Sequence, residues 1–160
     1  MAMQVVNRKG EREDVRFDAI QEKLVKLAKG LDPVWVDPGH VTKLTIEGLY
    51  DGVTTRELDQ LAAETAASLA SHHPDYSRLA ARICVDDLHR STKTTFTDVI
   101  TDLREYIDPE SNKHAPLISE EVYEIIMANA EVLNNHIDYD RDHNYDCLLY
   151  TSPSPRDMWT

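Results

Sequence analysis

Apolar residues recur at helical spacing through the first ninety or so residues, and residues that favour helix ends separate the runs. In the first run, Ile20, Leu24 and Leu27 lie on one face of a helix, and Gly30 follows them as a stop signal. The same periodicity continues in three further runs. The pattern therefore predicts four helices, over about residues 19–29, 38–50, 55–71 and 75–92.

Three of the predicted helices begin at capping signals. Each signal places a side-chain oxygen where it can accept a hydrogen bond from the first free backbone N–H groups of the helix. The signals are Asp18 with Gln21, Asp37 followed by Pro38, and Thr54 with Glu57.

Two short apolar segments precede the first helix. Met3 to Val6 and Asp14 to Phe17 flank the polar, glycine-containing turn Asn7 to Gly10, a pattern that predicts a β-hairpin. The expected fold is thus mainly α: a small helical bundle capped by an N-terminal β-hairpin.

The pattern becomes sparser beyond residue 95. It predicts a short helix near residues 96–103, a break from Asp108 to Pro116 and an amphipathic helix from Glu120 to Leu133. The Pro- and Ser-containing end has no periodicity. We expect residues 1–94 to form one domain, residues 95–146 a helical extension and residues 147–160 a disordered tail.

Charge and cysteine content exclude several classes of protein. Seventeen basic and 29 acidic residues give a net charge of -12, which repels a nucleic-acid backbone. Cys84 and Cys147 are the only cysteines, so the chain cannot form a four-cysteine zinc site, and a reduced, cytoplasmic protein is expected. No apolar run reaches the ~20 residues of a membrane span.

The sequence contains no P-loop and no G-x-G-x-x-G fingerprint. Phosphate could still bind where Arg8 and Lys9 lie close to the N-termini of helices. The carboxylates of residues 138–142 suggest a calcium loop, but His143 and Leu149 stand where that loop needs Gly and Glu. Metal ligands are therefore not expected, and no set of nucleophile, base and orienting residue is evident.

Four segments together resemble one known family: Gly52–Asp59, Leu61–Ala67, His73–Tyr76 and Leu79–Ile83. They are similar to the ATP cone of class I ribonucleotide reductase large subunits, of the eukaryotic type. The resemblance covers roughly residues 3–146. It implies a regulatory domain that binds ATP as an activator or dATP as an inhibitor.

The resemblance also implies which residues contact the nucleotide. Arg8 and Arg90 would hold phosphate oxygens, Thr55 and Asp59 would read the sugar or base, and residues 13–18 would wall the base. The complete implied set is Asn7, Arg8, Glu13, Asp14, Val15, Arg16, Phe17, Asp18, Ala19, Thr55, Asp59 and Arg90.

Several positions depart from the family. Asn7 and Ala19 replace lysines, Lys9 replaces an acidic or amide residue, and Arg90 stands where lysine is common. A helical interaction module that has lost nucleotide binding therefore remains an alternative. A nucleotide-responsive repressor is disfavoured, because such proteins add a four-cysteine zinc ribbon.

Residues 147–160 resemble translated sequencing-adapter sequence, so we expect an N-terminal fragment of a reductase large subunit with no catalytic residues of its own. The resemblance implies that the parent enzyme reduces ribonucleoside diphosphates by a radical mechanism, with electrons from thioredoxin or glutaredoxin. Its partners would be further large subunits and the small radical-generating subunit. Neither nucleic acid nor a membrane is an expected partner.

Overall fold

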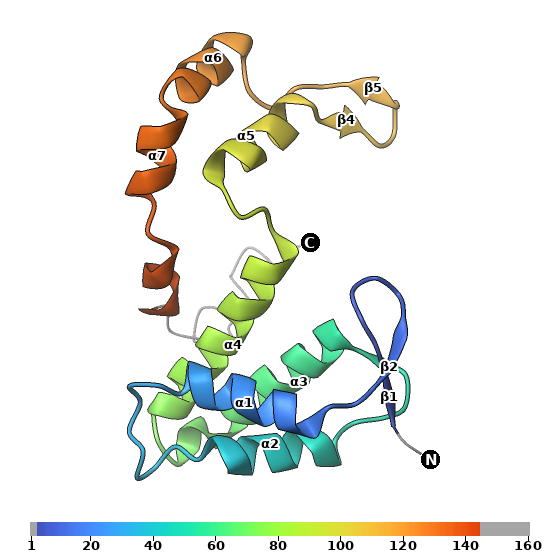
Figure 1. The fold of residues 1–160 in the computed structure, drawn as a ribbon, viewed down its shortest axis with the longest axis vertical. Coiled ribbons are helices and arrows are strands. Elements are labelled where there is room, and N and C mark those ends of the chain that lie inside the picture. Colours follow the sequence, from blue (N-terminus) through green and yellow to red (C-terminus); the bar gives the residue numbers. More distant parts are fainter. Residues whose placement is uncertain (1–2, 145–160) are drawn as a thin grey trace, which may run out of the picture. The chain divides into compact units, whose positions relative to one another are not determined.

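The computed structural model describes residues 3–144. They form two compact units, one made of residues 3–87 with 141–144 and the other of residues 88–140. Both are mainly helical, and the first carries a small sheet at its N-terminus (Figure 1). The predicted fold class, a helical bundle with an N-terminal β-hairpin, is confirmed. The predicted tail at residues 147–160 lies outside the described residues.

The hairpin consists of β1 (Gln4–Val6) and β2 (Arg12–Asp14). The prediction of its second strand over Asp14 to Phe17 is wrong. Gly10, at φ +83°, closes the turn by donating a hydrogen bond from its N–H to the Asn7 carbonyl. The pairing of the two strands therefore already begins with Val6 opposite Arg12. Phe17 is consequently left to begin a helix.

A third strand, β3 (Val53–Thr54), pairs in parallel with β1 and gives the order β2-β1-β3. The sequence pattern did not predict it, because two residues show no alternation. Gly52 turns the chain into this strand at φ +83° and donates its N–H to the carbonyl of Gln4 at 2.8 Å. β3 leads directly into the helix that follows, so the sheet fixes where that helix begins.

Four α-helices follow the predicted runs closely, and the third continues into a single 3₁₀ turn. The helices are α1 (Phe17–Leu27), α2 (Pro38–Glu47), α3 (Thr55–Ser68) with η1 (Leu69–Ser71), and α4 (Asp75–Ser91).

Two of the three predicted caps are confirmed. The Asp37 side chain accepts from the N–H of Gly39 at 2.8 Å, and Thr54 and Glu57 form a complete capping box. The prediction of Asp18 as an N-cap is wrong. α1 begins two residues earlier, after Arg16, and Asp18 lies inside the first turn, where its charge still complements the helix dipole.

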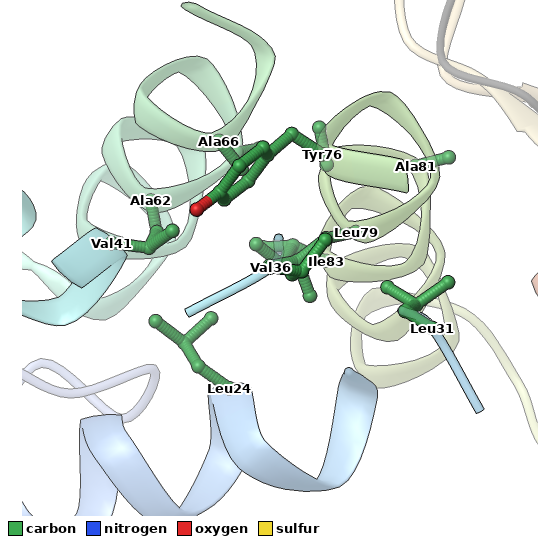
Figure 2. Packing of buried hydrophobic residues seen from close by; sticks show 12 residues of the cluster. Leu24, Leu31, Val36, Val41, Ala62, Ala66, Tyr76, Leu79, Ala81 and Ile83 are labelled. Carbon is green, nitrogen blue, oxygen red and sulfur yellow. The ribbon is translucent and has the colours of Figure 1, made fainter. Parts of the chain in front are cut away.

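The first unit is built around one apolar core to which all four helices contribute (Figure 2). Leu24, Val41, Leu79 and Ile83 are essentially inaccessible to solvent. Replacing such a leucine by alanine costs roughly 2–5 kcal/mol. Alanines of α3 and α4 fill the remaining core positions, among them Ala62, Ala63, Ala66, Ala80 and Ala81.

Polar residues of α4 fasten the connection between α1 and α2. Asp75 accepts from the N–H of Asp32 at 2.9 Å, and the Tyr76 hydroxyl accepts from the N–H of Asp37 at 3.2 Å. Arg82 donates to the carbonyls of Leu27 and Lys29, at 2.7 and 2.9 Å, and thereby satisfies free acceptors at the C-terminus of α1. Residues of His73–Tyr76 and Leu79–Ile83, two of the segments that carry the family resemblance, therefore stabilise the fold.

The second unit contains the end of α4, three helices and a short hairpin: α5 (Phe96–Arg104), β4 (Ile107–Asp108), β5 (Lys113–His114), α6 (Glu120–Ala128) and α7 (Ala130–His136). A 3₁₀ segment, η2 (Tyr139–Asn144), follows. The predicted single helix Glu120–Leu133 is wrong, because the backbone leaves helical geometry at Asn129. The Asn129 side chain there donates to the carbonyl of Ile125. Within residues 3–144, no helix is long and apolar enough to cross a membrane.

Candidate functional site

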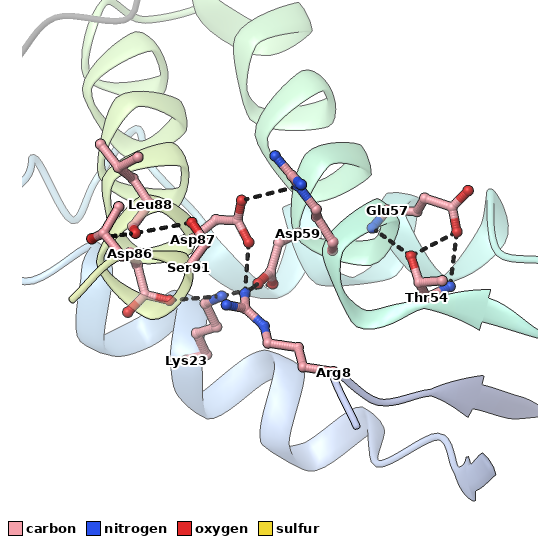
Figure 3. Close-up of polar contacts among 11 residues, drawn as sticks. Arg8, Lys23, Thr54, Glu57, Asp59, Asp86, Asp87, Leu88 and Ser91 are labelled. Atoms are coloured by element: carbon pink, nitrogen blue, oxygen red, sulfur yellow. Dashed lines mark hydrogen bonds and ion pairs between the residues drawn. The ribbon is translucent and has the colours of Figure 1, made fainter. Parts of the chain in front are cut away.

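Six charged side chains of the first unit form a line of alternating ion pairs (Figure 3). Three are cations and three are carboxylates, and they come from the hairpin turn, α1, α3 and the last part of α4 that belongs to this unit. In order, they are Asp86, Lys23, Asp59, Arg8, Asp87 and Arg56. We call these six residues the charge cluster.

Asp59 occupies the centre of the charge cluster. Its Oδ1 lies 2.6 Å from Nζ of Lys23, and its Oδ2 lies 3.6 Å from Nη2 of Arg8. The residue is only 8% exposed, because it lies in the second turn of α3 beside the buried Leu58. A charged group this far from water needs polar or charged partners to offset its lost hydration, and the two cations supply them.

The hairpin turn presents Arg8 to the helices. The Asn7 side chain shapes this turn: its Oδ1 accepts from the N–H groups of Lys9 and Glu11, and its Nδ2 donates to the Glu11 carboxylate. The polar side-chain atoms of Asn7 are thus hydrogen-bonded within the turn. Arg8 extends from it and donates to Oδ1 of Asp87 at 2.6 Å.

α4 contributes two neighbouring carboxylates to the charge cluster. Asp86 lies 2.8 Å from Nζ of Lys23, and Asp87 lies 3.9 Å from Nε of Arg56 as well as 2.6 Å from Arg8. Three cations against three carboxylates leave the cluster formally neutral. The basic side chains are therefore already compensated in the protein alone.

The N-terminus of α3 lies next to the cluster in sequence. Thr55 is its first residue and is half-buried, one turn before Asp59 and on the same side of the helix. The Thr54 N–H donates to the Glu57 carboxylate, and this hydrogen bond holds the pKa of Glu57 below its ordinary value. The start of the helix is thus fixed independently of any ligand.

The predicted segment Glu13 to Ala19 crosses from β2 into α1. Glu13 and Asp14 are exposed on the strand, and the N–H of Val15 donates to the carbonyl of Met3 at 3.0 Å. Val15 is half-buried.

The rest of this segment opens α1. Arg16 and Asp18 pair with each other at 3.5 Å on the surface, and Phe17 exposes 43% of its area. Ala19 is half-buried and lies one turn before Lys23. The link between this segment and the charge cluster is Lys23, which lies further along the same helix.

The predicted site residues thus divide into three groups. Arg8 and Asp59 are in direct contact, and Thr55 lies one turn from Asp59. Asn7 and the segment 13–19 adjoin the elements that carry the cluster. Arg90 lies in the last turn of α4 and belongs to the second unit.

Sequence reasoning missed four members of the charge cluster: Lys23, Arg56, Asp86 and Asp87. A usable signal existed. Lys23 directly precedes the buried Leu24, and Asp86 and Asp87 follow Ile83 by three and four residues, at the edge of a buried face. Charged residues at such edges on facing helices are candidates for partly buried ion pairs. Among residues 3–144, no group of three or more His, Cys, Asp or Glu side chains could hold a metal ion.

The sequence matches the family of the ATP cone domain over residues 3–91. The chain belongs to this family. Its relatives include three proteins named as large chains or subunits of ribonucleoside-diphosphate reductase, with identities of 50% over 143 residues in Saccharomyces cerevisiae (large chain 2), 49% over 144 in Danio rerio and 52% over 141 in Caenorhabditis elegans. These alignments cover 88–90% of this chain but only 16–18% of the relatives.

Proposed function

We propose that the chain is the nucleotide-binding regulatory region of a ribonucleoside-diphosphate reductase large subunit, and that it binds ATP or dATP as an allosteric effector. The match to the ATP cone domain and the names of the relatives support this proposal. Residues 1–94 would form the regulatory domain, and residues 95–146 would lead toward the remainder of the enzyme.

The observation that carries the proposal is the meeting of Arg8 with Asp59 beside the start of α3. A nucleotide needs a cation for its phosphates and an acceptor for its sugar or base, and these two residues supply one of each within 3.6 Å. Arg8 would hold phosphate oxygens. Thr55 and Asp59 would accept from the sugar hydroxyl or the base.

Lys23 supports the proposal because it offsets the loss of a family lysine. Ala19 replaces a family lysine, but Lys23 lies one turn further along the same helix and already reaches Asp59. It would restore the missing positive charge at the phosphates. Phe17 would offer an exposed aromatic surface to the base, within the segment from Glu13 to Ala19.

The activity of the whole enzyme follows as part of the same proposal. The parent protein would reduce ribonucleoside diphosphates to deoxyribonucleoside diphosphates in the cytoplasm by a radical mechanism. It would work with further large subunits and with a small radical-generating subunit. ATP and dATP would act by favouring different assemblies, which requires that each nucleotide bind those assemblies with unequal affinity.

Isothermal titration calorimetry with ATP and with dATP tests the proposal, combined with sedimentation velocity on the same samples. We expect both nucleotides to bind and at least one to change the sedimentation coefficient. Binding of neither at millimolar concentration would overturn the proposal and favour a helical interaction module without a ligand. The variant Arg8→Gln is expected to weaken binding, whereas Lys43→Gln, which removes an exposed cation from α2, is the matched control.

A further inference from the structure

The cations nearest to Asp59 are also held by carboxylates of α4. Arg8 donates to Asp87 at 2.6 Å, and Lys23 lies 2.8 Å from Asp86. The side chains of Asp86 and Asp87 are 25% and 21% exposed, so these pairs are partly shielded from water. In Figure 3 both carboxylates point toward the basic side chains from the α4 side.

A carboxylate on a guanidinium occupies the place of an anionic ligand. Phosphate and carboxylate oxygens accept from the same N–H fork of arginine, at similar distances. A phosphate that approaches Arg8 must therefore replace the Asp87 oxygen or share the guanidinium with it. Sharing brings two anions close together, and the carboxylate and the phosphate then repel each other.

We propose that Asp87, assisted by Asp86, is an internal competitor for the phosphates of the nucleotide. Binding exchanges Arg8 from Asp87 to a phosphate oxygen, and it exchanges Lys23 from Asp86 in the same way. The two carboxylates thus set the concentration at which the site fills. This inference rests on the proposed function, because it assumes that the phosphates bind at Arg8 and Lys23.

The size of the effect follows from the exposure of the pairs. Ion pairs that retain contact with water contribute up to about 1 kcal/mol, and this contribution is lost when the nucleotide takes over the cation. Removing the charge of Asp87 should therefore tighten binding by up to about fivefold. Removing the charge of Asp86 should act in the same direction through Lys23.

The test is calorimetric titration of the 160-residue chain with ATP and, separately, with inorganic tripolyphosphate. The variants are Asp87→Asn and Asp86→Asn, with Glu47→Gln as the matched control. Glu47 carries the same charge in the same unit, but it pairs at 3.9 Å with Lys43 on the exposed side of α2. We expect tighter binding of both probes by the two aspartate variants and an unchanged affinity in the control.

A double-mutant cycle with Arg8→Gln separates competition from a structural effect. If Asp87 acts by occupying Arg8, Asp87→Asn changes the affinity much less once Arg8 is gone. The inference is overturned, and the proposed function survives, if the wild type binds ATP but neither aspartate variant binds it more tightly than Glu47→Gln does. The same holds if the gain from Asp87→Asn persists undiminished in the Arg8→Gln background. If neither probe binds to any variant, the proposed function falls and the inference falls with it.

Discussion

The Nζ of Lys23 lies 2.6 Å from Oδ1 of Asp59, and this contact joins α1 to α3 at the centre of the charge cluster. The two residues are 36 positions apart in the sequence, and both side chains are largely buried. The pair therefore serves two purposes. It stabilises the helical packing of the protein alone, and it keeps a lysine and a carboxylate in place beside Arg8.

Asp59→Asn tests the structural part of this role. The substitution removes one of the two carboxylates that each of Lys23 and Arg8 contacts, so we expect the free energy of unfolding to fall by roughly 1–3 kcal/mol. Urea unfolding followed by far-UV circular dichroism measures the change. Glu64→Gln is the control, because Glu64 is exposed on the same helix and its carboxylate accepts a hydrogen bond from the exposed Gln60. Equal stability of Asp59→Asn and the control would show that Asp59 does not stabilise the helical packing.

Arg82 should be far more important for stability than the neighbouring Arg78. Arg82 donates to two carbonyls at the end of α1, whereas the Arg78 side chain is 63% exposed and pairs with Asp75 within α4. We expect Arg82→Ala to cost roughly 2 kcal/mol and Arg78→Ala less than about 1 kcal/mol. Thermal and urea unfolding of the two variants provide the comparison. Similar losses would show that the contacts with Leu27 and Lys29 contribute little.

Glu57 should make the stability of the first unit depend on acid pH. The backbone N–H of Thr54 lowers the pKa of Glu57 in the folded protein, so the unfolded chain binds the proton more readily. The stabilisation is complete above the ordinary pKa of about 4.3 and is lost as the pH falls through the lower, folded value. Glu57→Gln lacks this component, and its stability should therefore approach that of the wild type in acid. Unfolding curves between about pH 7 and pH 3 measure this convergence, and a constant difference across the range would contradict it.

The sequence predicted those features of the fold that depend on local residues. The apolar periodicity predicted α1 to α4, and Asp37 and Thr54 marked two helix starts, because a cap is formed by residues within one turn. The features it missed depend on distant partners. β3 is a strand only because Val53 pairs with Val5, and α1 begins before Asp18 because the strand pairing ends early.

The same distinction between local features and long-range contacts holds for the candidate site. The resemblance indicated Arg8 and Asp59, which the structure brings into contact, but it did not indicate that Asp86 and Asp87 compete for the same cations. No spacing rule within one helix predicts a pair such as Arg8 with Asp87, which are 79 residues apart. Such pairs depend on how the hairpin turn meets the helices, and only the folded structure supplies that information.

A residue-resolved NMR titration with ATP is the sharpest test of nucleotide binding at the charge cluster. We expect the amide shifts of the ¹⁵N-labelled chain to change most at Arg8, Lys23, Thr55 and Asp59, and we expect Arg8→Gln to weaken these changes without altering the rest of the spectrum. The amide shifts on the exposed side of α2 around Lys43 should remain unchanged. Shifts confined to other surfaces, or a spectrum that ATP leaves unaltered at millimolar concentration, would contradict the assignment of this site to nucleotide binding.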